Sequence, residues 1–171
     1  MSKLSVNTIA HTGGTTGITI NSAGVVTQPT KPMFKVDQST DQTISHATPT
    51  TVEFNNLSHV DAFDIGSYFN TSNYRYIPQV AGYYFFATTV TIQSSVTDYV
   101  IVFIRKNGVS QYRNLATDNP HNGHLSSHVS GIVYMNGSSD YVDVQVQHNA
   151  GASKDTNSNF EYSNFNGFLI G

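Results

Sequence analysis

The stretch at residues 81–92 constrains the fold more than any other part of the chain. It reads Ala-Gly-Tyr-Tyr-Phe-Phe-Ala-Thr-Thr-Val-Thr-Ile, and its aromatic and β-branched residues are typical of a β-strand. Because side chains alternate between the two faces of a strand, Tyr84 and Phe86 share one face, and Tyr83 and Phe85 share the other. A strand with one solvent-exposed face should not carry aromatic side chains on both of its faces. We therefore expect Tyr83 and Phe85 to be covered by a second layer of the chain or by another subunit.

Residues 99–104 pose the same problem. This second stretch would place Tyr99, Ile101 and Phe103 on one face of a strand, with three aliphatic residues on the other face. One sandwich layer cannot bury both faces. The sequence thus predicts a subunit interface formed by Tyr83, Phe85, Tyr99, Ile101 and Phe103.

The rest of the chain reads as short strands separated by turns, without a helix pattern of useful length. Asn107-Gly108 predicts a two-residue hairpin whose returning strand covers 109–115, followed by a long polar loop at 115–125. Asn136-Gly137 marks another turn, and further strands are expected at 129–135, 141–146 and 160–170. The sequence therefore predicts an all-β protein.

Composition limits the partners and the setting. The net charge is −3 and there is no basic run, so we expect no nucleic-acid partner. No apolar run approaches the ~20 residues that cross a bilayer, so membrane insertion is not expected. Cys is absent, and the first residues lack the apolar core of a secretory signal. A protein made in a reducing cytoplasm and later exposed outside would have these features.

The chain divides into two units at its prolines. Residues 1–32 contain scattered apolar residues and Gly-rich turns, too few to form a core alone, and end at Pro29 and Pro32. Residues 33–171 supply enough alternating strands for an independent domain. We expect an extended attachment segment at 1–32 and a folded domain at 33–171.

No motif in the chain predicts catalysis or a cofactor. His121, His124 and His128 lie close together but match no zinc spacing, and Asp61, Asp64, Asp98 and Asp118 match no calcium loop. No Gly-x-Ser-x-Gly element, phosphate loop or Cys nucleophile occurs. We expect no enzyme, no metal and no cofactor. Five loop residues are candidates for facing a ligand: Tyr68, Tyr74, Tyr112, His121 and His124.

Several residues carry a resemblance to the C1q-like domain, a relative of the tumour-necrosis-factor fold. Gly82, Tyr84 and Phe86 fit its Gly-x-Tyr-x-Phe element, and 165–170 is similar to its last strand. Further anchors fall at Asp64, Phe69 and Tyr76 (Phe in the family) and at 140–142, whereas Ser58 departs from an early Phe. The resemblance covers roughly residue 34 to the end. It implies a jelly-roll sandwich and a homotrimer, and it implies no ligand.

The first unit is similar to the head of many tailed-phage fibre and appendage proteins. The similar sequence is Leu-Ser-Val-Asn-Thr-Ile, followed by Gly-rich turns and then Ile-Thr-Ile-Asn-Ser-Ala-Gly-Val-Val. It implies a virion structural protein: a fibre or appendage knob that adheres to a host surface glycan or protein, and is joined to other virion proteins through residues 1–32. The alternatives are a capsid decoration protein that stabilises the shell and a non-viral C1q-like recognition module.

Overall fold

Antiparallel pairing of β-strands organises the part of the chain that the structure describes. The computed structural model describes residues 5–93, 99–117 and 123–171. Within these ranges every regular element is a strand, and no helix is long and apolar enough to cross a membrane. The all-β prediction is confirmed.

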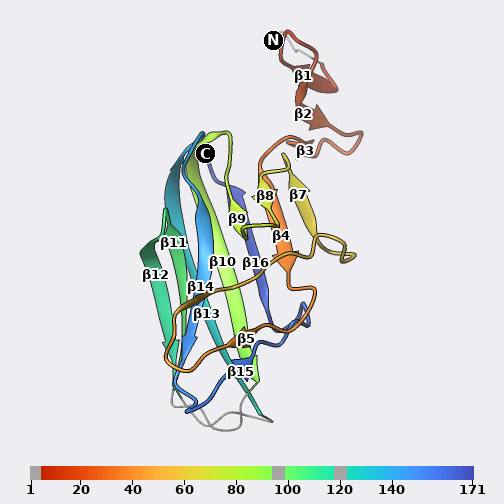
Figure 1. Ribbon diagram of the computed structural model, residues 1–171. Helices are drawn as coiled ribbons and strands as arrows, with labels where there is room; N and C mark the ends of the chain where they lie inside the picture. The colour runs from red at the N-terminus through yellow and green to blue at the C-terminus, as the bar shows by residue number, and fades with distance from the viewer. Residues whose placement is uncertain (1–4, 94–98, 118–122) are drawn as a thin grey trace.

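Two sheets face each other to form a sandwich (Figure 1). The five-stranded sheet has the order β13 (His124–Asn136), β10 (Ala81–Gln93), β16 (Asn164–Leu169), β4 (Met33–Asp37), β7 (Phe63–Ile65). The six-stranded sheet has the order β12 (Val109–Ala116), β11 (Val100–Lys106), β14 (Val142–His148), β9 (Arg75–Tyr76), β8 (Phe69–Asn70), and β6 (Thr50–Thr51) also pairs with β14. A small pair, β15 (Lys154–Asp155) with β5 (Thr43–Ile44), lies at the end opposite the N-terminal unit.

The core between the sheets is largely aromatic. Phe34 of β4 stacks on Tyr76 of β9 with ring centroids 4.2 Å apart, and meets the edge of Phe165 of β16 at 4.9 Å. Tyr84 and Phe86 of β10 are fully buried beside them. Aromatic side chains bury large areas, so this cluster holds the two sheets together across the sandwich.

The N-terminal unit is a separate three-stranded sheet of β1 (Thr8–Ala10), β2 (Thr16–Ile20) and β3 (Val26–Thr27). It projects from the sandwich at the end where the C-terminus lies (Figure 1). The connection is tied down where the Leu169 amide donates to the Pro32 carbonyl at 2.9 Å and Lys31 Nζ donates to the Ile170 carbonyl at 3.2 Å. The expected boundary at residue 32 falls between β3 and β4.

The hairpin prediction is confirmed by the connection between β11 and β12. Asn107 has φ 51° and Gly108 has φ 78°, and two positive φ values match the twist of the flanking strands. Asn adopts the left-handed conformation more readily than most other non-glycine residues do, which suits Asn107 to this position.

Two expected strand limits differ from the structure. β13 begins at His124 instead of residue 129, because it pairs with β10 along its full length, from Ala81↔Asn136 to Gln93↔His124. Long-range pairing therefore extends it through polar residues. Conversely, β16 begins at Asn164 instead of residue 160, because residues 160–163 form a turn. Much of the expected 115–125 loop lies outside the described residues.

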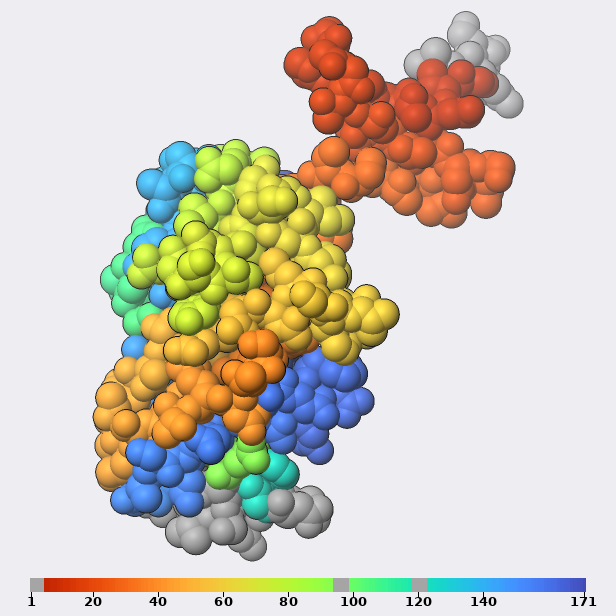
Figure 2. Space-filling view, turned by 45° about the vertical axis from the view of Figure 1, so that its right-hand side comes forward, coloured from red at the N-terminus to blue at the C-terminus, as the bar shows by residue number. Residues whose placement is uncertain are grey.

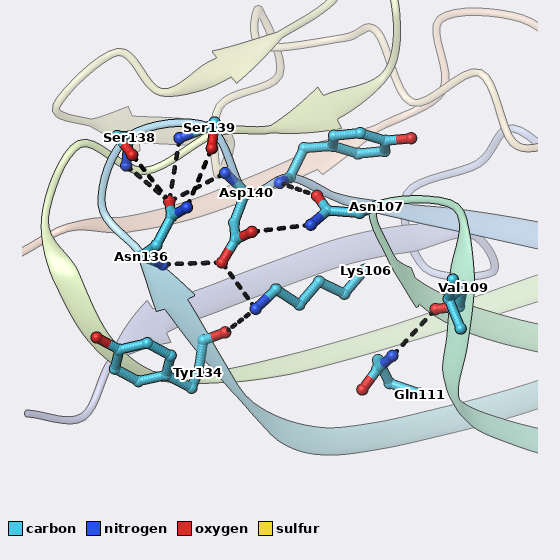
Figure 3. A network of polar contacts seen from close by, with 10 residues as sticks. Lys106, Asn107, Val109, Gln111, Tyr134, Asn136, Ser138, Ser139 and Asp140 are labelled. Atoms are coloured by element: carbon cyan, nitrogen blue, oxygen red, sulfur yellow. Dashed lines mark hydrogen bonds and ion pairs between the residues drawn. The ribbon is translucent and has the colours of Figure 1, made fainter.

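A polar network closes the end of the sandwich near the C-terminus (Figure 3). The Asp140 carboxylate lies 2.7 Å from Lys106 Nζ and accepts hydrogen bonds from Asn107 Nδ2 at 2.8 Å and the Asn136 amide at 2.9 Å. Lys106 Nζ also donates to the Tyr134 carbonyl at 2.7 Å, so the network joins β11 to β13. Burial raises the pKa of Asp140, but these hydrogen bonds and the Lys106 charge outweigh it and leave the pKa below its ordinary value.

We predict that Asp140 makes folding stability depend on acid pH. Because its pKa is lowered in the folded protein, its contribution is complete above the ordinary value of 3.8 and is lost as pH falls through the folded value. Asp140→Asn should lower the free energy of unfolding by roughly 1–3 kcal/mol at neutral pH. Its melting temperature should also fall less steeply than that of the wild type below about pH 4.

Asp61→Asn is the matched control, since Asp61 is exposed and its carboxylate makes no hydrogen bond or ion pair within the described structure. It should keep the wild-type melting curve at each pH. Parallel melting profiles for Asp140→Asn and the wild type would contradict the assigned role of the network.

Candidate functional site

We call the side of the five-stranded sheet that faces away from the core the exposed face. Strand register places Tyr83 opposite Tyr134, and Phe85 between Ile132 and Phe168. Tyr83 is 57% exposed, Ile132 51% and Phe168 44%. The rings of Tyr83 and Tyr134 lie 5.4 Å apart. The described residues of the same chain thus leave these apolar side chains uncovered.

The exposed face becomes polar toward its other end. The next row across the sheet is Ser130, Ala87 and Asn166, followed by His128, Thr89 and Asn164. Thr89 Oγ1 and His128 Nδ1 lie within hydrogen-bonding distance at 3.1 Å. This face is therefore graded, with an apolar end next to the N-terminal unit and a polar end far from it.

A shallow hollow of about 250 Å³ lies at the β4 side of the exposed face. Its lining includes Met33, Phe63 and Phe168. These side chains are apolar, and Phe168 also belongs to the uncovered area around Phe85. The hollow therefore extends that apolar area toward the edge of the sheet.

A buried carboxyl group lies at the end of β4. Asp37 is 2% exposed, and its Oδ1 has no hydrogen-bond partner among the described residues. Burial raises the pKa of Asp37, although the Asn56 hydrogen bond and the His59 and Lys35 charges act in the opposite direction.

The five expected interface residues do not share a face. Tyr83 and Phe85 lie on the exposed face described above. Tyr99, Ile101 and Phe103 are half-buried on the outer side of the six-stranded sheet, because Val100, Val102 and Ile104 of β11 point into the core. The two groups are thus on opposite sides of the sandwich. An interface that joined one group to the other would be heterologous, and it would form a ring only if the rotation between copies closes.

Two residues expected to face a ligand from loops lie in strands, and one of them, Tyr112, falls within the returning strand that the sequence predicted at 109–115. Tyr112 belongs to β12, and its hydroxyl donates to the Ile132 carbonyl at 2.9 Å. Its ring lies over Gly131, where an added Cβ would be 2.3 Å from it, so Tyr112 closes the sandwich edge between β12 and β13. His124 is the first residue of β13, with its ring 5.5 Å from that of Tyr162. His121 lies outside the described residues.

Tyr68 lines a cleft of about 470 Å³ beside β8, which we call the Tyr68 cleft. The other lining residues are Ser67, Phe69, Asn70, Thr71, Ile77 and Gln79. Asp64 shapes this cleft by accepting hydrogen bonds from the amides of Tyr68 at 3.2 Å and Phe69 at 2.8 Å. The sequence analysis proposed Tyr68 but not its polar neighbours in the cleft. In the sequence these neighbours appear only as part of a segment rich in turn-forming residues.

Tyr74 is the remaining candidate for facing a ligand. It lies in the turn before β9 with φ 62°, a left-handed conformation that is uncommon for a bulky residue. It is not among the residues that line the Tyr68 cleft. Of the four candidates that the structure describes, only Tyr68 therefore lines this cleft.

The described residues contain no group of three or more His, Cys, Asp or Glu that could hold a metal ion. His128 contacts Thr89, and the Asp64 carboxylate is engaged by backbone amides. Asp98, Asp118 and His121 lie outside the described residues, so the expectation of a metal-free protein stays a prediction.

Comparisons with known proteins identify the fold. No family model and no curated protein matches the chain. Among solved structures, the globular domain of zebrafish complement 1qA protein has a TM-score of 0.55 at 23% identity, covering 82% of this chain and 98% of that one. Murine APRIL at pH 5.0 has a TM-score of 0.62 at 11% identity, covering 82% of this chain and 99% of that one. The fold is the C1q/TNF-like jelly roll. At these identities the likeness shows the fold alone.

We predict that the stability of this C1q/TNF-like protein does not depend on a bound metal ion. A metal ion that binds only the folded state raises the melting temperature, so removing it with EDTA would lower that temperature. We expect the melting temperature to be the same with and without EDTA. A large fall in EDTA, restored by adding calcium or zinc, would contradict this prediction. It would indicate a site shared between copies of the chain or one that involves residues outside the described ranges.

Proposed function

We propose that this chain is a bacteriophage virion protein that adheres to the host surface. In this proposal residues 33–171 form a homotrimeric, non-enzymatic knob, and residues 1–32 attach the knob to other virion proteins. The protein is made in the host cytoplasm and exposed on the particle. The observation that carries the proposal is that the described residues leave two separate apolar surfaces uncovered, one on each unit.

The exposed face supports self-association of the knob. Tyr83, Tyr134, Ile132 and Phe168 form a contiguous apolar area on one rigid sheet, which is a common feature of protein interfaces. The C1q-like resemblance implies three copies. We therefore restrict the proposed interface to the exposed face, with Tyr83 and Phe85 from the residues that the sequence predicted.

The N-terminal unit supports attachment. Its register places Ile9 opposite Ile18, and Ile20 opposite Val26, so that these four side chains share one face. Thr8, Thr19 and Thr27 lie on the other face. Ile9 is 52% exposed and Val26 59%. A single three-stranded layer cannot bury such a face, and Figure 2 shows the unit projecting from one end of the knob.

The second candidate is a C1q-like recognition module that is not part of a virus. It is favoured by the solved structures that match, which include a zebrafish complement 1qA domain and murine APRIL. Capsid decoration is a third role for the same virion protein. Imaging intact particles by cryo-EM distinguishes the three, because it shows whether the protein is present and whether it lies on a fibre or on the shell.

We predict that Phe85→Asp dissociates the trimer. The substitution places a charge in the proposed interface, where burying it without a partner costs about 2 kcal/mol or more. Sedimentation velocity should show a folded monomer at a concentration where the wild type is a trimer.

Phe103→Asp is the matched control, because Phe103 is also half-buried but lies on the opposite side of the sandwich. It should remain a trimer. A wild-type monomer at micromolar concentration would rule out the trimer, whereas dissociation by Phe103→Asp alone would move the interface to the six-stranded sheet.

We predict that Ile18→Asp prevents incorporation into particles. An Ile side chain contributes about 1.5–3 kcal/mol when it is buried, so loss of that contact should reduce incorporation by about tenfold or more, measured by immunoblot of purified particles. Thr19→Asp is the control, since Thr19 lies on the polar face of the same strand, and it should incorporate normally.

Equal incorporation of Ile18→Asp and the wild type would show that attachment uses another surface. Absence of the wild-type protein itself from purified particles would contradict the virion proposal and favour the non-viral recognition module.

A further inference from the structure

We propose that the Tyr68 cleft binds a neutral saccharide. This inference rests on the proposed recognition function and names the class of ligand for it. The cleft volume of about 470 Å³ falls within the range of roughly 300–1,000 Å³ that is usual for small-molecule sites. The segment that forms it, yellow to yellow-green in Figure 2, faces the viewer on the side of the knob.

Among the described residues, no charged side chain lines the cleft. Its lining consists of Tyr, Phe and Ile with Ser, Thr, Asn and Gln. The charged groups next to it make contacts within the knob. The Asp64 carboxylate accepts hydrogen bonds from two backbone amides. The Arg75 guanidinium lies 3.9 Å from the centre of the Tyr141 ring and 3.8 Å from Asp143, although its Nε makes no hydrogen bond among the described residues. A charged ligand would lose hydration here without gaining a counter-charge, so a neutral ligand is favoured.

The polar groups of the cleft have unused hydrogen-bonding capacity. Within the described part of the chain, the hydroxyls of Ser67, Tyr68 and Thr71 make no hydrogen bond. The Asn70 side-chain oxygen accepts from the amides of Ser72 at 2.9 Å and Asn73 at 3.2 Å, which leaves its NH₂ group free. Hydroxyl groups both donate and accept, as the hydroxyls of a sugar do, so these groups match a polyhydroxylated ligand.

The backbone beside the cleft has two consecutive positive φ values and is supported by the Asp64 hydrogen bonds. Gly66 has φ 103° and Ser67 has φ 55°, and the Tyr68 ring lies where a Cβ on Gly66 would be, 2.4 Å from it. Non-glycine residues with positive φ cost energy and are concentrated at functional sites. A cleft that is already ordered loses little entropy when a ligand binds, and the Tyr68 ring and Ile77 offer apolar surface for the C–H groups of a sugar ring.

Saturation-transfer NMR with the full-length protein tests the proposal. The neutral probes are methyl α-D-glucopyranoside, methyl α-D-galactopyranoside and N-acetylglucosamine, and the charged comparators are glucuronate and glucosamine. We expect at least one neutral probe to bind, and to bind more tightly than either comparator. Thr71→Val removes a hydroxyl at nearly constant shape, and Asn70→Asp keeps the oxygen that orders the turn while removing the free NH₂ group. Each should weaken binding by about tenfold.

Thr27→Val is the control, because Thr27 is exposed on the polar face of the N-terminal sheet. It should bind the probe as the wild type does, and all variants should keep the wild-type melting temperature. The proposal is overturned if no neutral probe binds, if a charged comparator binds more tightly, or if Thr71→Val and Asn70→Asp bind like the control. If the protein is still found on particles and adsorbs to host cells in any of these cases, the adhesion proposal stands and only the ligand class is wrong.

Discussion

The double pairing of β10 is the constraint on which the rest of the structure depends. This strand pairs with β13 along its whole length on one side and with β16 on the other. Because its side chains alternate, Tyr84 and Phe86 enter the aromatic core, and Tyr83 and Phe85 are directed to the opposite face. A single strand thereby contributes both to the core and to an apolar area that the described chain leaves uncovered.

Charged groups are few, and two buried carboxylates are paired with cations. Arg105 binds Asp143 through two hydrogen bonds, at 2.8 and 2.9 Å, and Lys106 binds Asp140 at 2.7 Å. Both pairs lie near the β11–β12 hairpin, where they join it to neighbouring strands. Because a buried charge without a partner is costly, these pairs restrict how the six-stranded sheet can be arranged. Much of the remaining polar surface consists of neutral hydroxyl and amide groups, which suits hydrogen bonding more than electrostatic attraction.

The two proposed surfaces of the knob lie on different sheets. The exposed face belongs to the five-stranded sheet, and the Tyr68 cleft lies at β8, the edge strand of the six-stranded sheet. The N-terminal unit is joined to the knob at the C-terminal end of the sandwich (Figure 1). Self-association, attachment and ligand binding can therefore be disturbed one at a time, since each depends on residues that the others do not use.

The sequence by itself determined the features that arise from local backbone geometry. Alternation with a period of two separated the buried and exposed faces of β10 and β11, and Asn107-Gly108 placed the hairpin, because only such residues readily take two positive φ values. Tertiary structure decided which sheet each strand joins. It separated Phe85 from Phe103, extended β13 to His124, placed Tyr112 at the sandwich edge and gathered the polar residues around Tyr68. These features depend on pairing between residues far apart in the chain, and local patterns do not encode such partners.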